Sequence, residues 1–240
     1  MIRYSKGIMN KKILPTVTTT SNDYLGKLSE AQKLNLKEIC LFLTGLKIKE
    51  RKKLYQQLEK TPIKKIPFVH LRSDMELWEL DFLVENYQTK LFNLHTASQF
   101  PHLFDISKYR DKIYIENTIN YPFDENEVKK FAGVCIDFAH LENDFILRDK
   151  NYKKNLKVIK KFPCGCGHIS AITDKLIYYS EDKIYSYDSH YLKDYSELDY
   201  LIGYRQYLPD VMAIELENSI KEQLRIKDYL QNHLLLDSKM

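Results

Sequence analysis

Glycine and proline are scarce in this chain, at seven residues each among 240. An all-β sandwich or barrel needs a tight turn about every ten residues, so this scarcity argues against that class. Hydrophobic residues make up 44% of the sequence and charged residues 29%, which excludes a disordered or fibrous protein and indicates a globular one.

Cysteine is also scarce, with four residues, too few for a disulfide framework in a chain of this length. No run approaches the roughly 20 apolar residues that span a bilayer, and residues 1–6 do not resemble a signal peptide. We therefore expect a cytoplasmic protein with reduced thiols and no membrane partner. The formal net charge of +4 is too small to argue for a polyanionic partner.

No linker or low-complexity tract divides the sequence, so we predict one domain over residues 1–240. Short apolar runs that are typical of buried strands occur at residues 13–17, 38–44, 66–71, 90–95, 112–117, 133–138, 167–172 and 211–217. Segments with helical spacing lie between most of them, at residues 25–34, 49–60, 75–86, 124–131, 145–161, 196–208 and 219–235.

This alternation predicts an α/β protein, a single (β/α)8 TIM barrel. The rival is an open sheet that binds a dinucleotide, which needs a glycine-rich loop after its first strand. Residues 18–23 follow the first strand here and contain no glycine, so the barrel is favoured. Two basic segments, residues 47–65 and 145–161, are predicted to be solvated faces of outer helices.

Histidine and carboxylate residues recur where the predicted strands end. They are His70, His95, Glu116, Asp137, His140, His168, Asp188, His190, Glu215 and Glu217. In a barrel these ends meet at one mouth, where enzymes of this fold carry their chemistry. Burying so many ionisable groups together is unfavourable without a cation. The mixture of imidazole and carboxylate suits Zn²⁺, Mn²⁺ or Fe²⁺ better than Mg²⁺ or Ca²⁺.

Two motifs carry a resemblance to a known family. The string Ile-Glu-Asn-Thr at residues 115–118 is followed by Gly-Val-Cys-Ile-Asp-Phe-Ala-His at residues 133–140. Together they resemble the signature of endonuclease IV, a member of the xylose isomerase-like TIM barrel superfamily. The resemblance implies a hydrolase with up to three Zn²⁺ ions, with Mn²⁺ as the other possible metal, that cleaves DNA at abasic sites.

The resemblance also implies a set of ligands for each metal. The first metal would be held by His70, His95 and Glu116, and the third by His140, Asp188 and His190. The second would be held by Glu116, Asp137, His168 and Glu217. Glu116 would bridge the first two metals, and Glu116, Asp137 and Glu217 would be the catalytic residues. Glu215, two residues before Glu217 and on the same side of the strand, is the second choice. Arg72, directly after a ligand strand, is the candidate for binding a substrate phosphate.

A second function stays open. Sugar isomerases and epimerases of the same superfamily hold a single divalent metal with the equivalents of Glu116, Asp137, His168 and Glu217. In that case the substrate would be a sugar or sugar phosphate, and Glu116 and Glu217 would move a proton at carbon. Residues 71–73 and 96–98 differ from the DNA-contacting loops of the endonucleases, which favours this alternative. The Asp-Ser-His string at residues 188–190 favours the nuclease.

Overall fold

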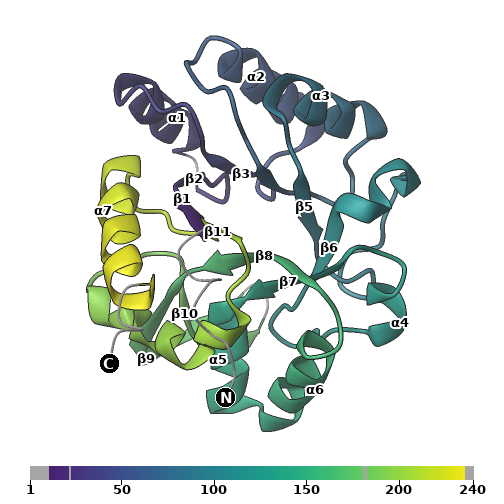
Figure 1. Cartoon of the computed structure of the whole chain (residues 1–240), viewed down its shortest axis with the longest axis vertical. Helices are drawn as coiled ribbons and strands as arrows, with labels where there is room; N and C mark the ends of the chain where they lie inside the picture. The colour runs from purple at the N-terminus through teal and green to yellow at the C-terminus, as the bar shows by residue number, and fades with distance from the viewer. Residues whose placement is uncertain (1–10, 22, 181–182, 236–240) are drawn as a thin grey trace, which may run out of the picture.

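A computed structural model describes residues 11–21, 23–180 and 183–235 of the chain. Residues 1–10, 22, 181–182 and 236–240, which the predicted domain includes, lie outside this description. Nine parallel strands form one sheet in the order β1-β11-β8-β7-β6-β5-β4-β3-β2 (Figure 1). They are β1 (Lys12–Leu14), β2 (Thr16–Val17), β3 (Cys40–Phe42), β4 (Phe68–His70), β5 (Leu91–Leu94), β6 (Ile113–Glu116), β7 (Gly133–Asp137), β8 (Cys164–Ile169) and β11 (Val211–Ile214).

The two end strands of this sheet, β1 and β2, are one strand interrupted at Pro15. β1 pairs with β11 and β2 pairs with β3, so the chain itself joins the two ends of the sheet. Proline has no N–H to donate, and the Pro15 carbonyl accepts a 2.9 Å hydrogen bond from the Cys40 amide. The sheet therefore closes into a barrel with eight strand positions, and the prediction of a TIM barrel is confirmed.

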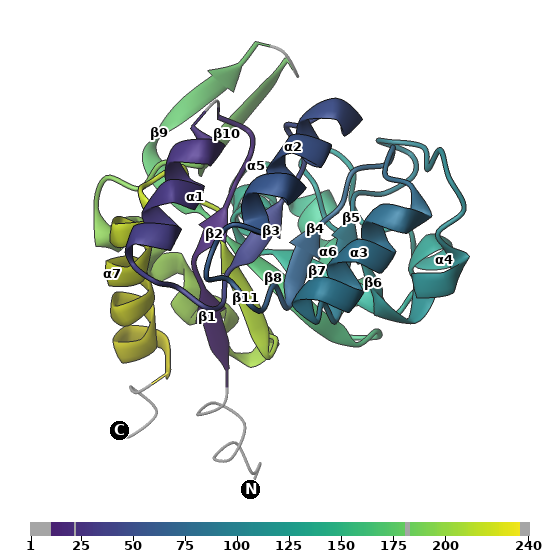
Figure 2. The same cartoon turned by 90° about the horizontal axis from the view of Figure 1, so that it is seen from above.

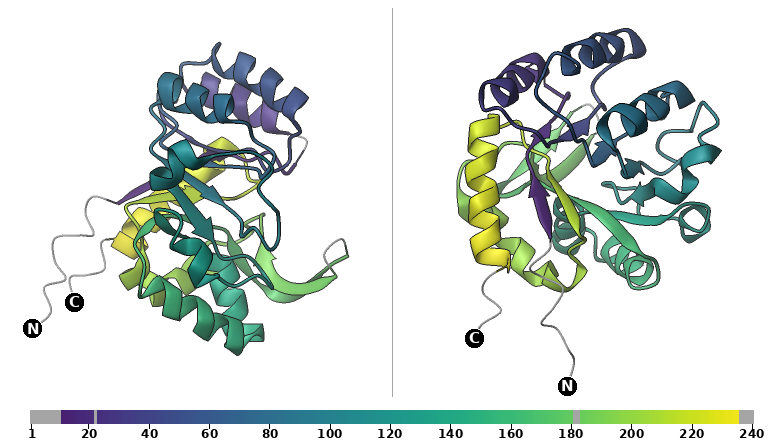
Figure 3. Two further views of the ribbon diagram at one scale, coloured as in Figure 1. Left: turned by 90° about the vertical axis from the view of Figure 1, so that its right-hand side faces the viewer. Right: turned by 45° about the horizontal axis from the view of Figure 1, so that its top comes forward.

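Helices surround the barrel, as Figures 1 and 3 show. They are α1 (Tyr24–Lys33), α2 (Ile48–Leu58), α3 (Leu77–Tyr87), η2 (Ser107–Lys112), α4 (Glu125–Val128), α5 (Phe138–Leu147), α6 (Asp149–Ile159), η3 (Tyr195–Tyr207), α7 (Ile220–Leu230) and η4 (Gln231–Leu235). The segment predicted as a helix over residues 196–208 is the 3₁₀ helix η3, and η4 is a π-helical turn. Within the described residues, no helix is both long and apolar enough to cross a bilayer.

Two segments differ from the prediction. The helix expected over residues 145–161 is two helices, because α5 already begins at Phe138, directly after β7. The chain after β8 forms an antiparallel hairpin of β9 (Ala171–Tyr179) and β10 (Ile184–Ser189), where only a loop was expected. This hairpin projects beyond the end of the barrel opposite to the start of β1 (Figures 2 and 3).

The interior of the barrel is filled by a small apolar cluster that supports the mouth. Its buried members are Leu14, Cys40, Phe42, Phe68, Cys135, Cys166 and Ala213. Side chains alternate along a strand, so a residue two positions further on also points into the barrel. Four members are followed at that distance by a histidine or a carboxylate residue: His70, Asp137, His168 and Glu215. These four polar side chains therefore lie one layer above the apolar cluster inside the barrel.

Candidate metal centre

Glu116, the last residue of β6, lies at the centre of the polar side chains in the mouth. Its Oε2 is 3.0 Å from Nε2 of His70, and its Oε1 is 3.6 Å from Nε2 of His95. The two Nε2 atoms of these histidines are 3.1 Å apart. Neighbouring strands β4, β5 and β6 thus bring together the three residues predicted for the first metal, with donor atoms within 4.8 Å of one another.

A second group of donor atoms is formed by Asp137, His168 and Glu215. Nδ1 of His168 lies 3.1 Å from Oε2 of Glu215, 3.7 Å from Oδ2 of Asp137 and 3.6 Å from Oε1 of Glu116. All four residues are buried. Three of the four residues predicted for the second metal therefore lie together, with Glu215 in the fourth place.

His140, on the first turn of α5, lies between this group and the hairpin. Its Nδ1 is 3.4 Å from Oδ2 of Asp137, and its Nε2 is 3.6 Å from Oδ2 of Asp188. Nε2 of His190 is 3.7 Å from the same Asp188 oxygen. Among the described residues, Glu116, Asp137 and His140 form a group within 4.8 Å, whereas the predicted third set of His140, Asp188 and His190 is more open and does not.

Glu217 lies outside these groups. Its carboxylate accepts hydrogen bonds from the Lys27 ammonium and from the hydroxyls of Thr18 (3.0 Å), Thr20 and Ser21. The three hydroxyls come from the segment between β2 and α1, and Lys27 lies in α1 itself. In the structure it is Glu215 that lies beside His168, at 3.1 Å, whereas Glu217 is three residues beyond the end of β11 at Ile214 and bonds to residues after β2.

Several residues that position the donors were not predicted. Asn117 forms two 2.9 Å hydrogen bonds with the backbone of Asp137, one to its carbonyl and one from its amide. The Asn93 amide donates to Oε2 of Glu116, and the Ser170 hydroxyl donates to Oδ1 of Asp188 at 2.7 Å. Asn117 stands inside the recognised motif, but Asn93 and Ser170 carry no sequence signal, because their roles depend on contacts between strands.

Asp137 has a second role as the N-cap of α5. Its Oδ1 accepts a 2.8 Å hydrogen bond from the backbone amide of His140. A carboxylate at this position satisfies one of the free N–H groups at the start of a helix. The same bond fixes the imidazole of His140 three residues later, next to the free Oδ2 of Asp137.

The carboxylates and imidazoles of the mouth shift each other's pKa values strongly. Burial opposes the ionised form of Glu215, but the neighbouring His168 outweighs it and lowers the pKa to about 2. Burial likewise opposes the charged form of His140, but Asp137 and Asp188 outweigh it and raise its pKa to about 9. For His95 burial dominates and lowers the pKa to about 4. The mouth therefore holds ionised carboxylates that need positive charge beside them.

The donors fit a divalent metal in two respects. Oδ2 of Asp137 is buried and accepts no hydrogen bond in the described part of the chain, and Nδ1 of His168, although 3.1 Å from Oε2 of Glu215, makes no hydrogen bond of regular geometry. Such unpaired atoms are unfavourable in an apolar surrounding, and a bound cation would satisfy them. The set also contains only imidazole and carboxylate ligands, which Zn²⁺ and Mn²⁺ accept.

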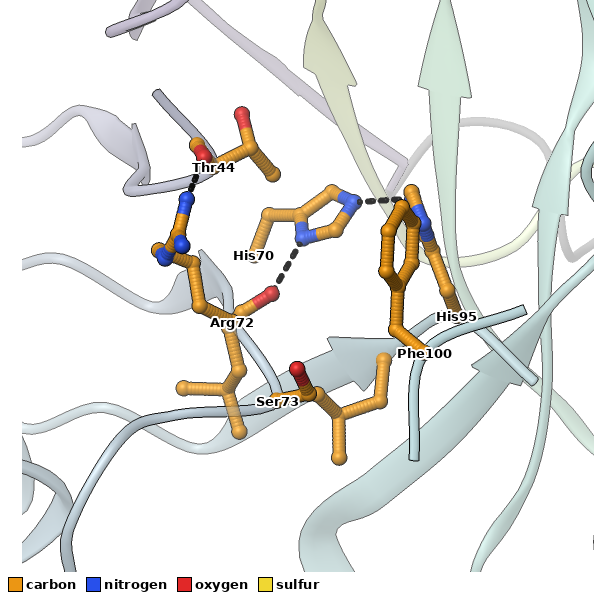
Figure 4. A pocket seen from close by; sticks show the side chains of 8 residues that line it. Thr44, His70, Arg72, Ser73, His95 and Phe100 are labelled. Carbon is orange, nitrogen blue, oxygen red and sulfur yellow. Dashed lines mark hydrogen bonds between the residues drawn. The ribbon is translucent and has the colours of Figure 1, made fainter. Parts of the chain in front are cut away.

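A cavity of about 150 Å³ adjoins the first donor group, beside His70 and His95. Figure 4 shows Thr44, Arg72, Ser73 and Phe100 around it. The guanidinium of Arg72 lies at its rim, bonded to the Thr44 carbonyl and, at 2.9 Å from Nε, to Asp74. The residue predicted to bind phosphate is therefore next to the centre, but its charge is already paired with a carboxylate.

No protein-family model and no curated protein matches this chain. Among solved structures, a xylose isomerase-like TIM barrel protein from Mycobacterium smegmatis in complex with magnesium has 13% identity and a TM-score of 0.48, covering 93% of this chain and 98% of that chain. A D-tagatose 3-epimerase-like protein has 12% identity and a TM-score of 0.43, covering 92% of this chain and 97% of that chain. Similarities of this size transfer no substrate or reaction to the chain.

Proposed function

We propose that the chain is a metal-dependent enzyme with its active centre at the barrel mouth, and that it hydrolyses a phosphoester. The observation that carries the proposal is the position of Glu116. Its carboxylate lies 3.0 to 4.0 Å from an imidazole nitrogen of four histidines, His70, His95, His140 and His168. A carboxylate shared in this way suits a bridge between metals, whereas a centre with one metal leaves several of these histidines without a role.

The first metal would be held by His70, His95 and Glu116, and the second by Glu116, Asp137, His168 and Glu215. Asp188 and His190, with His140, are the candidates for a third. Zn²⁺ is the metal we expect first, with Mn²⁺ as the other choice. Divalent ions with such ligands supply polarisation of phosphoryl oxygens and neutralisation of negative charge.

The residues of the chain hold these donors in fixed orientations and leave one side open. Nδ1 of His70 is bonded to the Leu71 carbonyl at 2.8 Å, which turns Nε2 of the ring towards Glu116. The side chains of Glu116 and His168 are at most 2% exposed, but those of His95 and His190 are 23% and 35% exposed. We therefore propose that the substrate approaches over His95 and His190, while the inner donors stay shielded from water.

An assay of phosphodiester hydrolysis tests the proposal. The zinc-loaded chain is offered bis(4-nitrophenyl) phosphate and, separately, a DNA duplex with one abasic site, the substrate that the resemblance implies. We expect hydrolysis of at least one of them, and a loss of at least about 100-fold in kcat for Glu116→Gln. Lys53→Met, on the exposed face of α2, is the matched control and should keep the parent rate. A chain that carries metal and hydrolyses neither substrate contradicts the proposal.

Isomerisation or epimerisation of a small sugar is the second candidate, favoured by a different observation. Glu116 and Glu215 approach the same His168 nitrogen from separate strands, at 3.6 and 3.1 Å. Two carboxylates around one small space could remove a proton from a sugar carbon and return it. The paired charge of Arg72 also suits a small neutral substrate better than a polyanion. Incorporation of deuterium from D2O into a ketose, lost in Glu215→Gln, would support this candidate over hydrolysis.

A further inference from the structure

The hairpin of β9 and β10 has two different faces. Pairing places Ile184 opposite Tyr179, and the next pair, Tyr185 opposite Tyr178, points to the other side. Tyr179 and Ile184 line a cavity of about 260 Å³ together with Ile119, His140, Asp188 and His190. Tyr178 and Tyr185 are more than half exposed on the outer face. One face of the hairpin is thus a wall of the outer part of the centre.

This wall is fixed to the donors by hydrogen bonds. The Tyr179 hydroxyl donates to the carbonyl of Asp188 at 2.8 Å, and the Tyr187 amide donates to Oδ1 of Asn143 on α5 at 2.9 Å. Asp188 itself accepts from Ser170 below the hairpin. Because Ile184 and Asp188 belong to the same strand, the position of the wall and the position of the donor are coupled.

Ile119 faces this wall from the opposite side of the cavity. It lies in a tight turn closed by two hydrogen bonds between the backbones of Thr118 and Tyr121, at 3.0 and 3.3 Å. Ile119, His140 and Ile184 also border a second cavity, of about 210 Å³, that leads to His95. The two cavities therefore share both isoleucines, and the second of them is also lined by His95.

The chemistry of the hairpin face and of Ile119 opposite to it restricts which ligands the cavity can recognise. Ile119 and Ile184 carry no polar group, and the Tyr179 hydroxyl already donates to Asp188. These residues therefore offer no free hydrogen-bond donor and contribute to binding mainly by burying apolar surface. The floor of the same cavity is polar, since it consists of His140, Asp188 and His190. A ligand that fits has a polar end directed at the floor and an apolar end between the isoleucines.

We propose that Ile119, Tyr179 and Ile184 are specificity-determining residues that select a phosphoester carrying an apolar or flat aromatic group on its ester oxygen. The inference rests on the proposed phosphoester chemistry for the polar end of the ligand. It goes beyond that chemistry in assigning the hairpin, which lies outside the recognised motifs, to substrate selection.

Binding of two phosphonates that are not hydrolysed tests the inference. Phenylphosphonate and methylphosphonate share the polar end and differ only in the apolar group, and their Kd values for the zinc-loaded chain can be measured by titration calorimetry. We expect phenylphosphonate to bind at least about tenfold more tightly, since burial of about two methylene-sized groups, at about fourfold each, already gives that ratio. Ile184→Ser should reduce this ratio to near one. Tyr185→Ser changes the next residue of the same strand on the opposite face, and should keep the ratio.

The outcomes separate the two proposals. Equal Kd values for both phosphonates in the parent chain overturn the wall and leave the phosphoester function standing. A ratio that falls equally in Ile184→Ser and Tyr185→Ser, with unchanged thermal unfolding, also overturns the wall. If the parent chain prefers phenylphosphonate and Glu116→Gln binds it with unchanged Kd, the role of the hairpin is supported. Binding of the phosphonate group at the metals is then contradicted. Absence of binding by either phosphonate contradicts both.

Discussion

The side chain of Asn117 holds the backbone of Asp137 through two hydrogen bonds of 2.9 Å. The bonds connect the ends of β6 and β7 and are buried with both residues. They orient Asp137, and the carbonyl of the same Asn117 lies 3.1 Å from Nδ1 of His140. A residue of this kind acts on a metal site through the ligand it positions.

Replacing Asn117 should therefore weaken metal binding without removing a ligand. We expect Asn117→Leu to lower the affinity for Zn²⁺ by about 10- to 100-fold, the usual effect of losing a positioning hydrogen bond. Competition with a chromophoric chelator measures this affinity. Asn86→Ala is the control, because the Asn86 amide donates to the Phe82 carbonyl on the exposed side of α3, away from the metal donors. Equal affinities in Asn117→Leu and the parent chain would contradict the assigned role.

A matched pair of variants tests the choice between the two glutamates after β11. Glu215→Gln removes a carboxylate that lies 3.1 Å from His168, and we expect it to lower the metal content of the purified chain. Glu217→Gln should keep the metal content but reduce stability by about 3–5 kcal/mol, because Lys27 is buried and would lose its charged partner. Elemental analysis and urea unfolding measure the two effects. Loss of metal in Glu217→Gln alone would restore the original assignment.

The number of metal ions is a direct measurement on the parent chain. We expect elemental analysis to find more than one divalent ion per chain, and up to three at full occupancy. His190→Ala should lose the outermost ion and keep the others, since Nε2 of His190 lies 3.7 Å from Oδ2 of Asp188, one of the proposed ligands of the third ion. A parent chain that binds a single ion after incubation with excess Zn²⁺ would exclude a bridging role for Glu116.

A buried ion pair between α2 and α3 should matter for stability. Arg51 has no exposed surface and bonds both oxygens of Glu79, at 2.8 and 2.9 Å. Arg51→Met leaves the Glu79 carboxylate buried and without its cation, so we expect a loss of about 3–5 kcal/mol in the free energy of unfolding. Urea denaturation measures it, and Lys53→Met on the exposed side of α2 should change the same quantity by less than about 0.5 kcal/mol. Similar values for both variants would show that the pair contributes little.

The barrel and most of the donors follow from local patterns in the sequence. Each of the eight predicted strands is a short apolar run, and the residue that ends it, such as His70 or Glu116, reaches the mouth because parallel strands share one orientation. The choice between Glu215 and Glu217 could not be made in this way. Alternation of side chains along a strand predicts that both glutamates point to the same side of β11. The partner that binds Glu217 is Lys27, 190 residues earlier in the chain.

Two elements that the sequence did not predict, the start of α5 and the hairpin of β9 and β10, escaped prediction for physical reasons. The start of α5 is masked because Phe138 and Ala139 continue the apolar run of β7, and only the capping bond of Asp137 marks the boundary. The hairpin is masked because Tyr178 and Tyr185 make its outer face nearly as apolar as its inner face, so the usual alternation for an exposed hairpin is absent.

The closure of the barrel between β1 and β11 has a consequence for how the chain folds. β1 pairs only with β11, and the amide and carbonyl of Thr16 are both bonded to the side chain of Gln223, 207 residues later. During synthesis the edge of β1 therefore stays unpaired until β11 has been made. Closure at such sequence separation is slow compared with local pairing. A chain that ends before β11 should remain an open sheet with an exposed edge, and is expected to aggregate rather than form a smaller barrel.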